Sequence, residues 1–411
     1  MDMNASVMQE ILSRLNLIYD FVTDIQGGSY NVVYSLLQLL DLSDQHRASA
    51  VYISPGSVPS LRINGQINLM NGSPLTVADC RKLLAPILTP ELQTKLQECG
   101  QAETFVTSTK SGFKVYLNLN MGNVCATFHR LRDDIPKLAN LGLSGKLIEG
   151  ILSSPGLVLL TGLPRSGKIN TLASMISHIN ATRQARIITL EKPIQFWHRN
   201  KSSVVIQREV GADVPSFSVG IEQTMKQELD VLGVDEITDR ETLVQVVRAA
   251  SSGRLVLAVL DATSASQALD RLVNSLNVDT YKNLISMLAS SLRLVLHQTL
   301  VERVDGRGVI PAFEILTNNE IIGNEIVQGR IDVGQIEQIM RSHNMQTLDN
   351  SLGRLVASGI VSEQEASKYL KTPLEFNAAS FANNRQNSTN TNAMTEDAIL
   401  EDGETPMMSW L

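Results

Sequence analysis

The chain has 411 residues, a net charge of −7 and a charged fraction of 19%. This length is too great for one ordinary domain, so two or three domains are expected. The acidic balance argues against a nucleic-acid-binding protein, and we expect no nucleic acid among the partners. We find no signal peptide, no run of 18 apolar residues and three cysteines without metal-ligand spacing, so a cytoplasmic location is expected.

Residues 1–45 are predicted to form a helical extension. Apolar residues recur at helical spacing from Met8 to Val22, and a second helical segment follows the pair Gly27–Gly28. The first helix has two interpretations that the sequence leaves open. It either docks on a partner or folds back on its own chain, since an apolar stripe is seldom left exposed.

Residues 46–135 mix alternating apolar and polar stretches with two short helical segments, which predicts a small α+β domain. Turn signals at Pro55–Gly56 and Asn64–Gly65 separate short antiparallel strands. Thr76 and Thr89 stand at positions that cap the two helices. Residues 136–142 are predicted to be a linker.

From residue 143 to residue 372, apolar runs alternate with segments of helix length. This alternation is typical of a largely parallel sheet covered by helices on both faces, so an α/β domain is predicted. Residues 373–411 are rich in Asn, Ser and Thr and then acidic. Such a composition cannot bury enough apolar surface to fold, and it predicts a disordered acidic tail.

The stretch TGLPRSGKIN, residues 161–170, contains the framework of a phosphate-binding loop. Gly162 is followed by four residues, Gly167 and Lys168, as in the P-loop of nucleotide-binding proteins. An apolar strand is predicted before the loop and a helix after it. In that setting, backbone N–H groups and the helix N-terminus surround the phosphates, and Lys168 reaches the outer ones.

Ile169 stands where the P-loop requires Ser or Thr and has no oxygen to offer Mg²⁺. Asn170 and Thr171 are polar, but each step along a helix turns a side chain by about 100°, so neither simply replaces the missing hydroxyl. We therefore predict weak ATP binding, a doubtful Mg²⁺ site and no metal ligand. The predicted nucleotide-binding residues of this stretch are Gly162, Ser166, Gly167, Lys168, Asn170 and Thr171.

Two carboxylates at the ends of apolar strands are the candidate catalytic residues. The run DVLGVDE ends in Asp235–Glu236, where acids hold magnesium through water or orient the attacking water. Its alternative interpretation is a solvated acidic turn. Glu191 ends another apolar run beside Lys192, where an exposed ion pair is the alternative. We take Glu191 and Glu236 as the catalytic candidates.

These elements and their order resemble the PilT/PilU family of type IV pilus retraction ATPases, in the secretion-ATPase superfamily, and its PilU branch more closely. The resemblance covers about residues 31–372. The stretches that carry it are SPGLVLLTGLPRSGK, IITLEKPIQFWHRNKSSVVIQREVG, DVLGVDEITDRET, SASQALDRLVN and HNMQTLD.

The resemblance implies an N-terminal PAS-like α+β domain, a RecA-like P-loop NTPase domain and a hexameric ring with ATP at a subunit boundary. It implies that the ring is a homo-hexamer or a hetero-hexamer with a PilT-type motor. The ring would act on an inner-membrane pilus platform protein, at the cytoplasmic face of that membrane. Arg130 and Arg132 match the family's paired arginines, which reach the phosphates of the neighbouring subunit.

The chain departs from the family pattern around the nucleotide. These departures are Ile169 for the P-loop Ser, Lys192 for the Asp of Glu-Asp-Pro, Asp235 for Gly, Thr238 for Arg, Arg254 and Asp261 for the two His-box histidines, and His129 for the first Arg of a trio. Together they touch the metal ligand, the acidic box and the phosphate sensors, so fast hydrolysis is not expected.

Three functions remain compatible with this pattern. The first is a weakly active or inactive accessory subunit of a pilus retraction motor. The second is a slow but genuine ATP-hydrolysing retraction motor with a reshaped metal site. The third is a ring-forming scaffold redeployed outside pilus retraction. ATP turnover by the purified protein separates the first two, and the identity of its partners tests the third.

Overall fold

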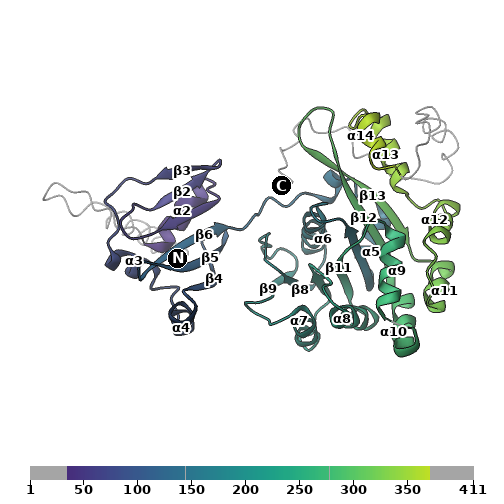
Figure 1. The fold of residues 1–411 in the computed structure, drawn as a ribbon, viewed down its shortest axis with the longest axis horizontal. Coiled ribbons are helices and arrows are strands. Elements are labelled where there is room, and N and C mark those ends of the chain that lie inside the picture. The colour runs from purple at the N-terminus through teal and green to yellow at the C-terminus, as the bar shows by residue number, and fades with distance from the viewer. Residues whose placement is uncertain (1–34, 144, 277, 371–411) are drawn as a thin grey trace, which may run out of the picture. The chain divides into compact units, whose positions relative to one another are not determined.

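A computed structural model of the chain describes residues 35–143, 145–276 and 278–370. The chain divides into two compact units between Asp133 and Asp134, and each unit is described by itself (Figure 1). The helix expected between Met8 and Val22 and the tail expected at residues 373–411 lie outside the described residues.

The N-terminal unit is built on a six-stranded antiparallel sheet in the order β3-β2-β1-β6-β5-β4. Its strands are β1 (Ala50–Ile53), β2 (Ser60–Ile63), β3 (Gln66–Leu69), β4 (Gln101–Thr107), β5 (Gly112–Asn120) and β6 (Asn123–Arg130). Its helices are α2 (Leu36–Gln45), α3 (Val77–Leu84) and α4 (Pro90–Cys99). This combination is the α+β arrangement that the sequence predicts.

Local sequence signals explain several boundaries in this unit. Thr76 and Thr89 are the N-caps of α3 and α4, as predicted, and each side chain accepts a hydrogen bond from a backbone N–H of the first turn. Asn64 and Gly65 both have positive φ and join β2 to β3 in a two-residue hairpin. These turns set the register that directs alternate side chains into one core.

The core of the N-terminal unit includes α2, which the sequence pattern placed in the extension before residue 46. Leu39 and Leu40 of this helix are fully buried and pack with Phe113 and Phe128 of the sheet. Because α2 shares this core, the folded unit begins before the boundary expected from the sequence.

The C-terminal unit is built on a seven-stranded sheet in the order β13-β12-β7-β11-β10-β8-β9. The strands are β7 (Gly156–Gly162), β8 (Arg186–Glu191), β9 (Val204–Glu209), β10 (Val231–Val234), β11 (Leu255–Asp261), β12 (Leu292–Glu302) and β13 (Val309–Thr317). Six of them are parallel and β13 is antiparallel. The predicted α/β class with a largely parallel sheet is confirmed.

Helices cover both faces of this sheet, because its strands are apolar on both faces. Successive residues of β7 alternate between two cores: Leu157 and Leu159 face one, and Val158 and Leu160 the other. The first core contains α7 (Phe217–Met225), α8 (Arg240–Ser251), α9 (Ala265–Leu276), α10 (Val278–Ser291), α11 (Glu320–Gln328) and α12 (Val333–Ser342). The second contains α5 (Lys146–Leu152), α6 (Lys168–Thr182) and the 3₁₀ helix η1 (Leu138–Leu141).

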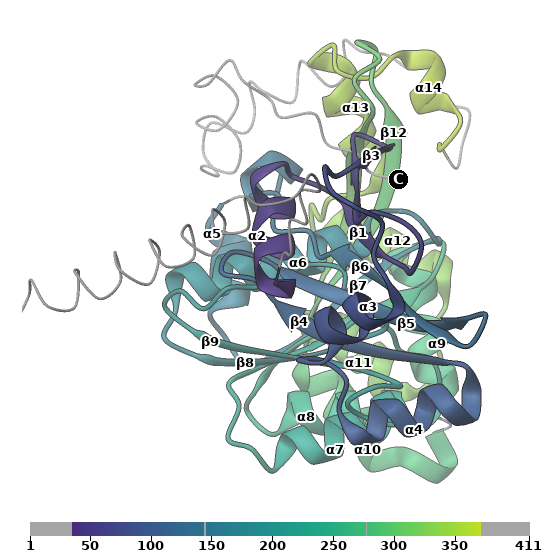
Figure 2. The same cartoon turned by 90° about the vertical axis from the view of Figure 1, so that its left-hand side faces the viewer.

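The segment expected as a linker, residues 136–142, contains η1. Leu138 and Leu141 of this helix are buried in the same core as α6, so most of the segment is part of the C-terminal unit. The hairpin of β12 and β13 extends beside α13 (Leu348–Ala357) and α14 (Glu363–Ser367), as Figures 1 and 2 show. In the described part of the chain, no helix is both long and apolar enough to cross a membrane.

Candidate nucleotide-binding site

The predicted phosphate-binding loop lies between β7 and α6, at the carboxyl end of the parallel sheet. Gly162 ends the strand at φ 153° and Gly167 begins the helix as its N-cap at φ 83°. A Cβ on Gly162 would lie 2.3 Å from Ser166 Oγ and 2.5 Å from the carbonyl oxygen of Gln298. Only glycine therefore allows the loop to turn this closely over the neighbouring strand.

The loop has the features that suit a phosphate. The first N–H groups of α6 point out of the helix without intrahelical partners, and they carry the positive end of its dipole. Ser166 Oγ and Gln298 Nε2 are buried, and neither has a hydrogen-bond partner among the residues that the structure describes. Unpartnered buried polar atoms beside a glycine loop fit an anion with several acceptor oxygens.

Lys168 is folded back onto its own loop. Its Nζ donates to the carbonyl oxygens of Gly162 at 2.9 Å and Leu163 at 2.7 Å, and it lies 3.0 Å from Oδ1 of Asp261. The Lys168 side chain is only 8% exposed. An ammonium group has three N–H donors, and these three oxygens account for all of them.

The three residues after Lys168 turn in different directions. Ile169 is half-buried and packs against the apolar core that contains α5 and α6. Asn170 is buried. The hydroxyl of Thr171 is fully buried and donates to Oε1 of Gln298 at 2.6 Å, so its hydrogen bond is made to β12.

Glu191, a catalytic candidate, lies at the end of β8, next to β10 in the sheet. It is buried, and its Oε1 accepts hydrogen bonds from Thr189 Oγ1 at 2.6 Å and Gln207 Nε2 at 2.9 Å. Burial raises the pKa of this carboxyl above its ordinary value, and the hydrogen bonds oppose the rise. The position is therefore not the exposed ion pair with Lys192 that the sequence left open.

Asp235 and Glu236 follow β10, and the structure separates their roles. Glu236, the second catalytic candidate, is exposed, whereas Asp235 is buried and accepts a hydrogen bond from the N–H of Lys192 at 2.7 Å. Burial raises the pKa of Asp235 to about 7, and the charges of Glu191 and Glu236 add to the rise. Asp235 and Glu191 are thus two buried carboxyl groups at the ends of the neighbouring strands β10 and β8.

Neither Asp235 nor Asp261 is among the site residues predicted from the sequence. Both directly follow or end buried parallel strands, and the carboxyl ends of parallel strands form the usual ligand edge of such sheets. For Asp235, its place directly after an apolar strand was the feature of the sequence that could have identified it. For Asp261 the decisive fact is the register, because it lies opposite Gly162 on the neighbouring strand.

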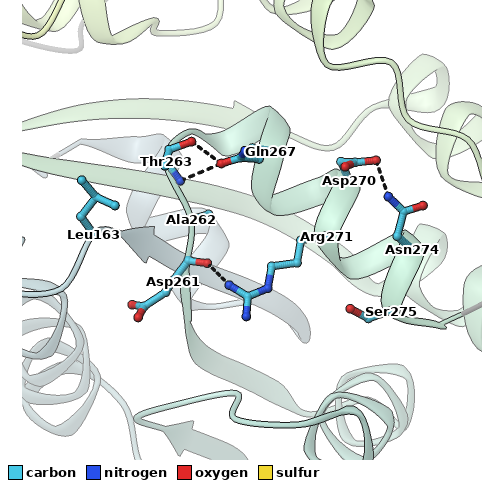
Figure 3. Close-up of a pocket in the computed structure, with 9 residues that line it drawn as sticks. All are labelled: Leu163, Asp261, Ala262, Thr263, Gln267, Asp270, Arg271, Asn274 and Ser275. Atoms are coloured by element: carbon cyan, nitrogen blue, oxygen red, sulfur yellow. Dashed lines mark hydrogen bonds between the residues drawn. The ribbon is translucent and has the colours of Figure 1, made fainter.

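A cavity of about 640 Å³ adjoins the loop beside Asp261 (Figure 3). Its lining residues come from the loop, the end of β11 and one face of α9: Leu163, Asp261, Ala262, Thr263, Gln267, Asp270, Arg271, Asn274 and Ser275. Arg271 donates to the backbone carbonyl of Asp261 at 2.7 Å. In the described part of the chain, no group of three or more His, Cys, Asp or Glu residues is arranged to hold a metal ion.

Arg130 and Arg132 belong to the N-terminal unit, at and beyond the end of β6. Arg130 Nε lies 3.1 Å from Asp44 Oδ1, and its Nη2 lies 3.1 Å from Asp133 Oδ2. Arg130 therefore has two carboxylate partners within its own unit. Arg132 is half-buried.

The chain is similar in sequence to proteins of known function. Residues 130–310 match the family model "Type II/IV secretion system protein". The chain is 32% identical over 345 residues to the type IV pilus retraction ATPase PilT of Pseudomonas aeruginosa, covering 83% of this chain and 99% of that protein. It is 29% identical over 333 residues to the type IV pilus ATPase PilU of the same organism, covering 80% and 87%. These identities do not favour PilU over PilT.

Solved structures resemble the fold as well. The crystal structure of the pilus retraction motor PilT with bound ADP has a TM-score of 0.67 and 30% identity, and the match covers 83% of this chain and 98% of that one. The Legionella pneumophila ATPase DotB has a TM-score of 0.65 and 23% identity, covering 83% and 97%, which supports the fold.

Proposed function

The chain belongs to the family of type IV pilus retraction ATPases, and we propose that it is an accessory subunit of a retraction motor, with weak or no ATP hydrolysis of its own. The observation that carries this proposal is Ile169. At the position of the P-loop hydroxyl it presents an apolar side chain, and that side chain packs into the core. The residue cannot supply an oxygen to a metal ion.

The residues at the loop therefore do not fit a magnesium site of the usual P-loop kind. Loss of metal-assisted charge stabilisation costs several kcal/mol in the transition state. The buried acids do not replace the metal, because a carboxyl group brings no positive charge to the phosphates. The raised pKa values of Glu191 and Asp235 lower the ionised fraction of each group at neutral pH, although each carboxylate, once ionised, is a stronger base.

Binding of a nucleotide is compatible with the same site. The backbone N–H groups at the start of α6, the unpartnered Ser166 Oγ and Lys168 would hold phosphate oxygens, while Gly162 keeps the loop close to the sheet. We propose that ATP binds weakly and acts as a structural ligand of the subunit. The hydrogen bond between Gln207 and Glu191 would then have a structural role at the ends of β9 and β8, and it would not support fast hydrolysis.

We further propose that the chain joins a hexameric ring, alone or mixed with a PilT-type motor, and acts with a pilus platform protein at the cytoplasmic face of the inner membrane. Family membership over most of the chain supports this assembly. The departures from the family pattern replace residues around the nucleotide site, whereas an apolar core lies on each face of the C-terminal sheet. Light scattering of the protein, alone and mixed with a PilT-type motor, tests it: monomer in both samples contradicts the ring.

A second candidate is a slow but genuine retraction ATPase. The buried pair of Glu191 and Asp235 favours it, because two acids held at the ends of neighbouring parallel strands provide groups that can orient water. In this case Glu191 and Asp235 would take over part of the role of the metal-binding and phosphate-sensing residues that the family pattern has and this chain lacks.

Turnover of ATP by the purified full-length chain separates the two candidates. The wild type, Ile169→Ser and Glu191→Gln are compared with Mg²⁺ and with Mn²⁺. An accessory subunit stays below roughly 1 s⁻¹, the lower end of ordinary enzymes, in the wild type and in Ile169→Ser. Wild-type turnover at or above that rate, abolished by Glu191→Gln, contradicts the accessory role and establishes the slow motor.

A further inference from the structure

The ammonium group of Lys168 has three oxygen partners within its own chain. Two of its three partners are carbonyl oxygens of the loop, from Gly162 and Leu163, and the third is the carboxylate of Asp261. Asp261 is the charged partner of the three. A phosphate that approaches Lys168 therefore meets a lysine whose charge is already paired with an acid of the same chain.

The position of Asp261 is fixed by the sheet. Asp261 lies directly opposite Gly162 in the parallel register of β11 and β7, and the N–H of Ala262 donates to the Gly162 carbonyl at 3.4 Å. Arg271 of α9 holds the Asp261 carbonyl oxygen at 2.7 Å. These contacts fix the Asp261 backbone beside the loop, and from there its carboxylate reaches Lys168.

The Asp261 side chain also faces the space that a ligand would enter. It is 48% exposed and lines the cavity of about 640 Å³ beside Leu163 (Figure 3). The carboxylate thus binds Lys168 and is also exposed enough to repel an anion that enters the cavity.

We propose that Asp261 is an intramolecular anion that competes with nucleotide phosphates for Lys168 and thereby sets the nucleotide affinity of this site. The proposal rests on the proposed nucleotide binding at the loop and adds the residue that limits it. A bound nucleotide must either displace the carboxylate from Lys168 or accept it as a like-charged neighbour. Both arrangements weaken binding: displacement breaks the ion pair between Lys168 and Asp261, and a carboxylate that stays in place repels the phosphate.

Binding of ATP to the purified full-length chain, measured by isothermal titration calorimetry, tests this role. EDTA is included so that no divalent cation screens the carboxylate. The variants are Asp261→Asn, which removes the charge but keeps an acceptor for Lys168, and Asp261→Ala, which removes both. Asp270→Asn is the matched control, because it removes an equal charge from the lining of the same cavity while Asp270 pairs with Asn274.

We expect both Asp261 variants to bind ATP about tenfold more tightly than the wild type, the effect of removing one close like charge. The ATP affinity of Asp270→Asn should stay within about threefold of the wild-type value, since solvent and salt screen a charge that does not contact Lys168. Equal affinities of wild type and Asp261→Asn, an equal gain in Asp270→Asn, or no binding by Asp261→Asn at millimolar ATP would overturn the proposal. Thermal melting of each variant shows that the chain is folded in every titration.

The affinity comparison of the Asp261 variants and the turnover test of the accessory role can fail independently of each other. Fast turnover by the wild type removes the accessory role and leaves the affinity comparison intact. Unchanged affinity on substitution of Asp261 removes the competition and leaves the turnover result as it is.

Discussion

Arg130 and Asp44 form an ion pair inside the N-terminal unit, with Nε of the arginine 3.1 Å from Oδ1 of the aspartate. The Asp44 side chain is 3% exposed, and the hydroxyl of Ser108 also donates to it. The pair joins α2 to the end of β6, which are 86 residues apart in sequence. Arg130, implied by family resemblance to reach a phosphate, therefore has a structural partner in its own unit.

The variant Arg130→Ala should lower the free energy of unfolding by about 2 kcal/mol or more, because it leaves the buried carboxylate of Asp44 without its charged partner. Urea denaturation of the wild type and the variant measures the difference. Arg81→Ala is the control, since Arg81 is an exposed arginine of α3 in the same unit. Equal losses in the two variants would show that the ion pair does not stabilise the fold.

Asp235 should make the stability of the chain depend on pH. The folded chain holds the Asp235 proton up to about pH 7, whereas an unfolded aspartate loses it near pH 4. As the pH rises through this range, the unfolded state releases a proton that the folded state keeps, so the stabilising contribution of this group falls.

The variant Asp235→Asn lacks this titration and should retain more of its stability as the pH rises. Between pH 5 and pH 8 the free energy of unfolding of the wild type should fall by about 2 kcal/mol more than that of the variant. Glu222→Gln removes an exposed carboxylate of α7 and should follow the wild type within about 0.5 kcal/mol. Parallel pH profiles for wild type and Asp235→Asn would refute the assignment.

Gly162 is the loop residue that is least able to accept a side chain. In Gly162→Ala the added methyl group meets Ser166 Oγ and the backbone carbonyl oxygen of Gln298, and the latter cannot move without shifting β12. We expect a loss of about 1–3 kcal/mol in the free energy of unfolding, the usual cost of such overpacking. Gly150→Ala lies in the exposed middle of α5, with no neighbour near its Cβ, and should be neutral or stabilising by up to about 1 kcal/mol. Thermal melts that place both variants at the wild-type midpoint would contradict the close packing of the loop.

The sequence predicts the parts of the site that are local in the chain. The strand, glycine loop and helix around Lys168 are contiguous, and their pattern fixes their order. The caps at Thr76 and Thr89 and the hairpin at Asn64–Gly65 are local for the same reason.

The contacts that decide the chemistry join residues far apart in sequence. Thr171 binds Gln298, which lies 127 residues away on β12, and Lys168 pairs with Asp261 through the register of β7 and β11. Neither pairing follows from spacing or composition, because each depends on strand order in the sheet. Burial has the same origin: Asp235 and Glu236 are neighbours in the chain, and only the packed structure shows which of them is enclosed.

Ile169 contributes to stability as well as to the loss of a metal ligand. In Ile169→Ser a half-buried apolar side chain is withdrawn from the core around α5 and α6, and we expect a loss on the order of 1 kcal/mol. Ile169→Val, which keeps the apolar contact, should lose less, under about 1 kcal/mol. A serine variant more stable than the valine variant in urea would show that Ile169 does not pack as described.

The same substitution should create a dependence on divalent cation that the wild type lacks. In Ile169→Ser the hydroxyl takes the position from which a P-loop binds Mg²⁺, so Mg²⁺ should tighten ATP binding by about tenfold relative to EDTA. The wild type and Ile169→Val offer no oxygen there, and their affinities with Mg²⁺ and with EDTA should agree within about threefold. Calorimetric titration of the three proteins under both conditions measures the effect. A tenfold tightening by Mg²⁺ in the wild type would mean that another group of the site, such as the buried acids at the ends of β8 and β10, holds the cation, and the case for weak hydrolysis would lose its main support.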